Sequence, residues 1–358
     1  MRRRVRLSKF RSSAQDLRLE VILMNVRDLE IRKQLGGFAP SSYLSNFAIM
    51  HFESSDLASK RLFPICPVDL PSGHFFEFDA GDLARNGVQN KPDYGKVSPT
   101  VLGHSTDSYS CKLKQILIGI DKLVAAAYQR PSIGINLEEV RTKVVVEQIA
   151  LAQEFDFAEK FFKKGAWSNE WTGAATYNAA QKKFAKFDKA DADPVAFIDE
   201  RVNDIKRTGR RKPNKLALGA DAFVALKNHP AVKERIKYSG TTQNPAVVTE
   251  QVLAQILGLD AVVVLDATYN AANVGAPADM KFICDSKSAL LLYAPDAPAI
   301  DLPSAGYIFS WTLSGTDYIT IQRIEGDLAT HADFLEGLVA YDIRKTSDAL
   351  GVFMAECV

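Results

Sequence analysis

The residues most able to carry chemistry are four cysteines and five histidines, and their spacing does not assemble a recognised site. Cys66, Cys111, Cys284 and Cys357 are far apart and form no Cys-x-x-Cys pair, which argues against a zinc site or a disulfide framework. No two histidines stand four residues apart, as a metal-binding pair on a helix would. We therefore expect reduced, partly buried thiols, structural histidines and no metal site.

Signatures of common enzymes are missing as well. The sequence has no Walker A loop, no Gly-x-Gly-x-x-Gly motif and no Gly-x-Ser-x-Gly motif. Cys111 could act as a nucleophile only if the fold brought a histidine and an acid to it. A cysteine-dependent hydrolase is therefore a remote alternative, and we expect a protein that is not an enzyme and needs no cofactor.

The N-terminus is strongly basic, with six cations in its first eleven residues and no acid before Asp16. Phosphate contacts made by such cations depend on salt and ignore base sequence. We regard this segment as a possible contact with DNA or with a scaffold; a solvated or cleaved tail is the alternative. The candidate residues are Arg2, Arg3, Arg4, Arg6, Lys9 and Arg11.

The composition is that of a soluble globular chain. Of 358 residues, 47% are hydrophobic and 24% are charged, which allows a large core. The net charge of +1 argues against a dedicated nucleic-acid-binding module. No stretch approaches the roughly 18 apolar residues of a membrane span, and the basic N-terminus lacks the apolar segment of a secretory signal. We expect folding in the cytoplasm and no membrane partner.

The N-terminal third predicts an arm followed by a long hairpin. Helical spacing covers residues 16–35 and stops at Gly36-Gly37, and residues 63–68 are extended because Pro64 and Pro67 restrict the backbone. Strand patterns at 74–78 and 109–113 flank an irregular stretch at 85–107. A two-stranded hairpin cannot bury both faces by itself. It should lie on its own chain or on a neighbour.

Residues 136–164 predict one long helix. Asn136 is a good N-cap, Glu139 completes a capping box and Gly165 ends the segment. At ~1.5 Å per residue the helix would be about 40 Å long, a spine against which a sheet can pack. Its expected apolar stripe consists of Val140, Val144, Leu151, Phe155, Ala158 and Phe162.

The remainder predicts a compact α/β lobe and a β-rich tail. Residues 166–189 look irregular, and Asp193-Pro194 opens a helix over 195–208. From Pro213 onward, strands and short helices alternate up to about residue 304. Strands of the lobe are expected at 215–218, 260–265, 282–284 and 289–293, helices at 220–228, 231–238 and 249–257, and tail strands at 307–313, 318–324, 338–345 and 352–357.

An ordered set of short segments resembles the major capsid proteins of tailed bacteriophages. The segments include Pro-Asn-Lys-Leu-Ala-Leu-Gly at 213–219, Leu-Lys-Asn-His-Pro at 226–230, Ala-Leu-Leu-Leu-Tyr at 289–293 and Gly-Tyr-Ile-Phe at 306–309 followed by Trp311. Phe-Pro-Ile-Cys-Pro-Val at 63–68 and Tyr-Ser-Cys at 109–111 resemble the extended loop of that family. The resemblance covers roughly residues 45–358 and departs from the family at 1–40, 165–189 and 325–337.

The resemblance implies an α+β Hong-Kong-97-type capsid fold. Its parts would be an N-terminal arm (1–50), an extended β-hairpin loop (51–112), a peripheral domain (113–212) with the spine helix at 136–164, an axial domain (213–304) and return strands (305–358).

It also implies a function. Copies would assemble as hexamers and pentamers into an icosahedral shell that encloses viral double-stranded DNA, in a virion assembled in the host cytoplasm. Implied partners are other copies of the chain, a portal, scaffolding or decoration proteins, and packaged DNA bound non-specifically. An encapsulin-like nanocompartment shell is the alternative within this fold.

Candidate contacts between subunits lie mainly on the extended loop. They are Phe63, Val68, Phe75, Phe76, Phe78, Lys91, Tyr109 and Trp167. For Trp167 core and interface are equally open, whereas Trp311, in a strand, should be core. Some relatives weld their shells through a lysine–asparagine isopeptide bond, and Lys91 lies near the loop tip, although its partner would have to come from another subunit.

Overall fold

A computed structural model describes residues 41–54, 58–78, 104–124, 136–239, 248–273, 275–298, 303–312, 318–326 and 331–358, and the single residues 88, 90, 91, 93 and 95. The predicted arm helix at 16–35 and the six arm cations lie outside these residues. The chain divides into two compact units. The first comprises 1–53, 115–146 and 319–338, and the second comprises 54–114, 147–318 and 339–358.

The first unit joins helix α2 (Ser42–Ser54) to strand β13 (Ile319–Ile324). The Ser41 backbone N–H donates to the Ile321 carbonyl at 2.8 Å, and the Ile321 N–H donates to Ser45 Oγ at 2.9 Å. The buried apolar residues of this unit come from these two elements, from helix α6 (Leu137–Phe161) and from strand β14 (Ala332–Lys345), and include Leu44, Ala48, Phe52, Val145, Val146, Ile319, Ile321 and Leu335. Residues 318–324 alternate apolar and polar side chains, which predicts one buried and one wet face, and this prediction is wrong: β13 buries Ile319, Thr320 and Ile321 in succession and exposes Arg323, on the same face as Ile319 and Ile321.

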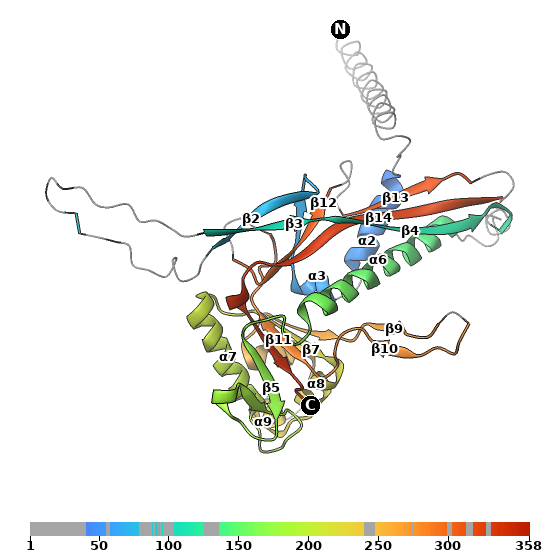
Figure 1. The fold of residues 1–358 in the computed structure, drawn as a ribbon. Helices are drawn as coiled ribbons and strands as arrows, with labels where there is room; N and C mark the ends of the chain where they lie inside the picture. The colour runs from blue at the N-terminus through green and yellow to red at the C-terminus, as the bar shows by residue number, and fades with distance from the viewer. Residues whose placement is uncertain are drawn as a thin grey trace, which may run out of the picture. The chain divides into compact units, whose positions relative to one another are not determined.

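The second unit is built on a six-stranded mixed sheet, ordered β6-β5-β15-β11-β7-β8 (Figure 1). Strands β7, β11 and β15 are buried along their whole length, which explains why these segments read as continuous apolar runs. The strands are β5 (Glu170–Ala174), β6 (Lys183–Ala185), β7 (Lys215–Gly219), β8 (Ala261–Leu265), β11 (Ala289–Leu292) and β15 (Gly351–Ala355).

The helices of this unit confirm the local signals. They are α3 (Ala58–Leu62), α7 (Pro194–Gly209), α8 (Ala220–Asn228), α9 (Pro230–Ser239) and α10 (Glu250–Leu257). Asp193 caps α7 by accepting from the backbone N–H groups of Val195 and Ala196. Gly258 ends α10 at a φ of 61°, the left-handed conformation that glycine adopts without strain.

One expectation about the lobe needs correction. The stretch 166–189 is not irregular, because it supplies β5 and β6. The C-terminal strand β15 lies between β11 and β5 and pairs Met354 with Ala289 on one side and with Trp171 on the other. The return strand β15 thus joins this sheet, as the expected return of residues 305–358 to the peripheral and axial domains allows, and the sheet depends on pairing between residues about 180 positions apart.

A second sheet contains β1 (Ile65–Val68), β12 (Gly306–Trp311), β14 (Ala332–Lys345) and β13 in that order, with β4 (Lys112–Asp121) also paired to β14. β1 runs parallel to β12, with Cys66 opposite Phe309. The extended segment at 63–68 is thus an edge strand of this sheet rather than the start of the hairpin. Its edge position tolerates Pro67, which has no backbone N–H to donate.

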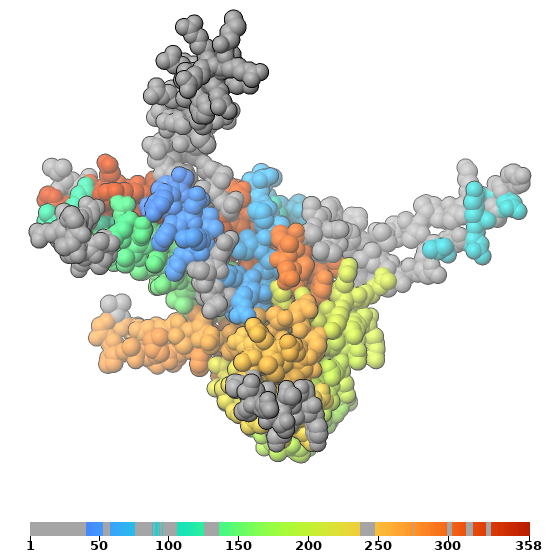
Figure 2. Space-filling view, turned by 180° about the vertical axis from the view of Figure 1, so that it is seen from behind, coloured from blue at the N-terminus to red at the C-terminus, as the bar shows by residue number. Residues whose placement is uncertain are grey.

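Two hairpins form separate two-stranded sheets. In the first, β2 (Ser72–Phe78) pairs with β3 (His104–Ser110); the hairpin is predicted, but its returning strand begins at His104, inside the stretch predicted to be irregular, and ends at Ser110 rather than at residue 113, and most of its tip lies outside the described residues. In the second, β9 (Thr268–Asn270) pairs with β10 (Met280–Phe282) and forms a narrow projection, drawn in orange in Figure 2.

The spine helix is confirmed as α6 (Leu137–Phe161), but its predicted stripe is only partly right, since Phe162 is buried and Val144, Leu151 and Ala158 are half-buried. Val140 and Phe155 are 45% and 38% exposed. The buried residues of the helix are Thr142, Val145, Val146, Ile149, Ala150, Gln153, Glu154, Phe157 and Phe161. Apolar residues lie on more than one side of this helix, so the 3.6-residue period alone did not select the buried side. At its start Asn136 accepts from the Glu138 N–H, while Glu139 accepts from the Asn136 side-chain amide.

Candidate interaction surfaces

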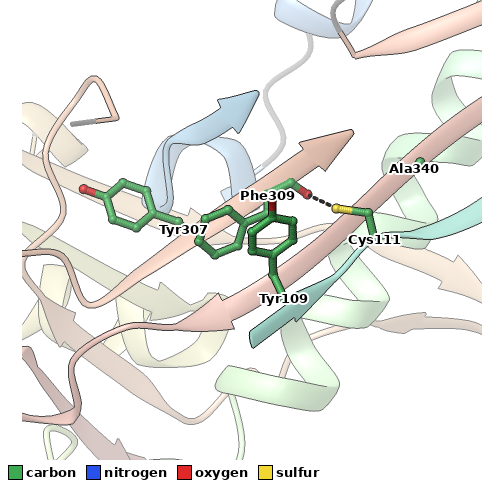
Figure 3. Packing of buried hydrophobic residues seen from close by; sticks show 5 residues of the cluster. All are labelled: Tyr109, Cys111, Tyr307, Phe309 and Ala340. Carbon is green, nitrogen blue, oxygen red and sulfur yellow. Dashed lines mark hydrogen bonds between the residues drawn. The ribbon is translucent and has the colours of Figure 1, made fainter. Parts of the chain in front are cut away.

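The base of the β2–β3 hairpin is fixed by an aromatic stack within its own chain (Figure 3). Tyr109 stacks on Phe309 with ring centroids 4.7 Å apart, and Phe75 stacks on Phe309 at 5.2 Å. The stack belongs to a buried cluster of Tyr109, Cys111, Tyr307, Phe309 and Ala340. Gly73 stands opposite Tyr109, and a Cβ there would lie 2.7 Å from the tyrosine oxygen, so glycine leaves room for the ring.

A charged cluster beside this stack ties the hairpin to β14 and α6. The buried Asp342 carboxylate accepts from the Ser110 backbone N–H at 3.1 Å, from Lys160 Nζ at 3.0 Å and from Arg344 Nε at 2.6 Å. Burial alone would raise the pKa of Asp342, but these hydrogen bonds and cations outweigh it and hold the pKa below its usual value. The hairpin base is therefore held by both apolar and ionic contacts.

Lys114 forms a second polar link near the same base. Its Nζ donates to the Tyr341 hydroxyl at 3.0 Å and also contacts the Asp156 carboxylate of α6. Tyr341 is buried, which raises its pKa and keeps the phenol protonated. The arrangement is a structural bridge from β4 to α6.

The β9–β10 hairpin carries an exposed apolar surface. Met280 and Phe282 are 60% and 43% exposed. The hairpin is held at its root by Tyr269, whose ring meets Phe155 of α6 edge-on at 4.8 Å. Asn270 Oδ1 accepts from the backbone N–H groups of Ala272 and Asp279 and so closes the loop. This hairpin is not predicted from the sequence, although Asn270 and Gly275 between two short β-like segments are a usable turn signal.

A buried arginine on α7 is likewise not predicted from the sequence. Arg201 is 5% exposed and its guanidinium lies 3.8 Å above the Trp171 ring. Its Nη2 contacts Glu200 at 3.2 Å and Asp204 at 3.1 Å. This cation anchors α7 on β5, with Phe197 packed beside it.

No protein-family model matches the sequence. Over 236 residues the chain is 25% identical to the major capsid protein of Burkholderia phage BcepMu, an alignment covering 63% of this chain and 68% of that protein. A phage-related protein from Bordetella bronchiseptica RB50 has the same fold, with a TM-score of 0.67 and 21% identity over 89% of this chain and 97% of the other. This chain is similar to phage major capsid proteins. It has their α+β Hong-Kong-97-type fold, as the sequence predicts. A virus-like particle from Pyrococcus furiosus is also similar, with a TM-score of 0.49 and 9% identity over 88% of this chain and 100% of that one.

Two of the expected intersubunit residues of this phage capsid relative are buried in its own core. Phe63 is fully buried and meets Phe157 and Phe161 edge-on at 5.5 and 5.3 Å. Trp167 is 3% exposed and donates from Nε1 to the Phe161 carbonyl at 2.9 Å. Both side chains are covered by residues of their own chain that are distant in sequence; for Trp167 this is the core alternative that the sequence left open, and a contact of Phe63 with another copy stays a prediction.

The other expected contacts of the capsid relative lie at or near the hairpin. Phe75 and Val68 are half-buried against the aromatic cluster, and Tyr109 is buried within it. Lys91 is exposed. Phe76 and Phe78 belong to β2, but their side chains lie outside the described residues, as do Arg2, Arg3, Arg4, Arg6, Lys9 and Arg11. Trp311 is half-buried and donates from Nε1 to the Asp69 carbonyl at 3.1 Å.

The cysteine and histidine positions in this phage capsid relative favour structural roles. Cys111 is buried, its thiol donates to the Phe309 carbonyl at 3.5 Å, and burial raises its pKa to about 11, the opposite of what a nucleophile needs. His229 begins α9, where Nδ1 accepts from the Ala231 N–H and Nε2 bonds the Lys189 carbonyl. Within the described part of the chain, no group of three or more His, Cys, Asp or Glu could hold a metal ion, and no helix is long and apolar enough to cross a membrane.

Proposed function

We propose that this chain is a major capsid protein whose copies assemble into a closed icosahedral shell around viral double-stranded DNA. The observation that carries the proposal is its sequence relationship to the BcepMu major capsid protein, supported by a fold shared with a phage-related protein over 89% of the chain. The role is structural rather than catalytic, and the protein resides in the virion capsid after assembly in the host cytoplasm.

The two hairpins support assembly on physical grounds. Each is a two-stranded sheet outside the larger sheets, and an isolated two-stranded ribbon is marginally stable in water. The described outer side chains of β2–β3 include exposed His74, Thr106 and Ser108, and β10 exposes Met280 and Phe282. Neighbouring copies could cover these surfaces.

Many weak contacts of this kind are enough for a shell. Head-to-tail contacts that close into rings give the hexamers and pentamers of the proposal. Each contact can be weak because a closed particle engages many of them at once. The region 213–304 would surround the local symmetry axis, and the extended loop would lie across the neighbouring subunit.

The remaining partners belong to the same proposal. The basic arm, with Arg2, Arg3, Arg4, Arg6, Lys9 and Arg11, would contact packaged DNA or a scaffold through salt-dependent phosphate or carboxylate contacts. A portal and scaffolding or decoration proteins would complete the particle, and the first shell formed would be a procapsid that expands as DNA enters.

Electron microscopy of the purified chain tests the central claim. We expect closed particles whose number rises with protein concentration, and nuclease-protected double-stranded DNA in particles recovered from phage-producing cells. A stable, folded monomer that yields no particles at high concentration would overturn the proposal. Particles filled with a cargo protein instead of DNA would favour the nanocompartment alternative.

A further inference from the structure

Helix α7 exposes one stripe of side chains whose charge reverses along the helix. The exposed residues recur every three or four positions: Ala196, Asp199, Glu200, Asn203, Lys206 and Arg207. The opposite side is buried through Val195, Ile198, Val202 and Ile205, so packing on the sheet fixes the direction in which the stripe points. The stripe is acidic in its first half and basic in its second.

Intrahelical contacts neutralise these charges only in part. Acid and base are seven positions apart, about 10 Å along the axis, whereas ion pairs on one helix need a separation of three or four. Arg207 is 81% exposed and reaches only Asp204, at 3.8 Å. Glu200 contacts Arg201 but remains 56% exposed.

The helix dipole explains only part of the pattern. It favours cations in the last turn, which accounts for Lys206 and Arg207. Its effect fades within one turn of each end, so it does not account for Asp199 and Glu200 at the sixth and seventh positions of the helix.

The four charged residues lie at equal distances on either side of Asn203, with acids before it and bases after it. Asp199 and Arg207 each lie four residues from this centre, and Glu200 and Lys206 each lie three residues from it. If a second α7 runs antiparallel with Asn203 opposite Asn203, Asp199 faces Arg207 and Glu200 faces Lys206, while Asp204, already in contact with Arg201 and Arg207, lies opposite Val202. Such a contact is isologous, with the same patch used on both copies.

We propose that α7 is a contact surface between two copies of this chain, formed by antiparallel pairing of α7 with α7 about Asn203. A nucleic acid fits the stripe poorly, because its phosphates would meet two acids beside the two bases. The inference rests on the proposed function only in taking a second copy as the partner. Exposed ion pairs are individually weak and screened by salt, so this contact is reversible and salt-sensitive.

Charge reversal with rescue tests the pairing. Asp199→Arg gives a stripe with an added base, and Arg207→Asp gives one with an added acid. In a pair of identical helices, residue 199 of each copy faces residue 207 of the other, so each variant alone places like charges opposite each other at two positions. We therefore expect the protein concentration needed for particle formation to rise about tenfold at low salt. An equimolar mixture of the two variants, and the double variant Asp199→Arg with Arg207→Asp, should return to the wild-type concentration.

Matched controls separate a surface effect from misfolding. Lys233→Asp reverses an exposed charge on α9 and should leave particle formation unchanged. Thermal unfolding of every variant should match the wild type. If the single variants assemble as readily as the wild type, or if neither the mixture nor the double variant is rescued, the α7 pairing is overturned while shell formation stands.

Two further outcomes separate the two proposals. Loss of DNA retention in Arg207→Asp with normal particle formation would assign the basic end of α7 to nucleic acid and overturn the pairing. If the wild type forms no particles at all, the shell proposal fails. The α7 contact is then still testable, because sedimentation equilibrium should show a wild-type dimer that each single variant loses and the mixture regains.

Discussion

At the scale of single residues, Asp342 concentrates the polar contacts that hold the base of the extended hairpin. Its carboxylate is nearly inaccessible to water and binds a hairpin backbone N–H, a helix lysine and a strand arginine together. Because a buried carboxylate needs such partners to remain charged, these contacts and its ionisation depend on one another.

Replacing Asp342 by Asn should destabilise the protein by about 2 kcal/mol at pH 7, since three donors lose a charged acceptor. The folded-state pKa of Asp342 is lower than its unfolded value of about 4. Its stabilisation is therefore fully present above about pH 4 and is lost as pH falls through the folded pKa. Urea unfolding measures the free energy of unfolding of both proteins at pH 7 and pH 3. The difference in this free energy between the variant and the wild type should be smaller at pH 3. An equal difference at both values would contradict this account.

The cysteines should differ in reactivity. Burial raises the pKa of Cys111 to about 11 and that of Cys284 to about 12, and Cys357 is also buried with a raised pKa. Cys66 is partly exposed, although burial raises its pKa as well. Alkylation of the native protein at pH 8 with mass-spectrometric mapping should label Cys66 first. Rapid labelling of Cys111 would instead indicate that the hairpin base opens readily.

At the scale of elements, β15 matters because it lies inside the six-stranded sheet between β11 and β5. Its first residue, Gly351, is pressed against the Trp167 ring, and a Cβ there would overlap the ring. The segment 166–189, which was predicted to be irregular, thus contributes strand β5, which pairs with β15, and the Trp167 ring, which packs against the first residue of β15.

Gly351→Ala should therefore cost about 1–3 kcal/mol, because the Trp167 ring would have to shift out of a packed core. Gly119→Ala is the matched control: a Cβ at Gly119 would meet Phe334 at an ordinary 3.6 Å, so stability should stay within about 0.5 kcal/mol of the wild type. Thermal or denaturant unfolding measures both. Equal stability of the two variants would show that Trp167 is free to move.

At the scale of the whole molecule, three elements run through both compact units. β4, α6 and β14 each have one part in the first unit and one in the second. A change in any of them is therefore expected to affect both units, whereas the hairpins β2–β3 and β9–β10 belong to the second unit alone.

The β9–β10 hairpin offers a test of assembly separate from folding. Met280→Asp with Phe282→Asp alters exposed side chains, so the unfolding free energy should change by no more than about 0.5 kcal/mol. If neighbouring copies cover these residues, particle yield should fall strongly, because charges would be buried in the contact. Val224→Asp, at a residue 55% exposed on α8, is the control for an exposed apolar side chain elsewhere. Unchanged particle yield in the double variant would exclude the hairpin from the contact.

Local signals in the sequence determined where several helices begin and end, and the fold class. The opening of α7 at Asp193-Pro194 and the bounds of α8 follow from interactions within a few residues, and both are confirmed. The ordered segments that resemble capsid proteins gave the fold class, because they mark the same elements in the same order.

Only the tertiary structure decided which side of each helix is buried and which strands pair with one another. The buried side of α6, the burial of Phe63 and Trp167 and the pairing of Cys66 with Phe309 all depend on contacts between residues distant in the chain. Strand β5 is short and unremarkable by itself, and it becomes a strand because Trp171 pairs with Met354. Propensity acts over a few residues, whereas packing selects among similar apolar surfaces only when the whole chain is folded.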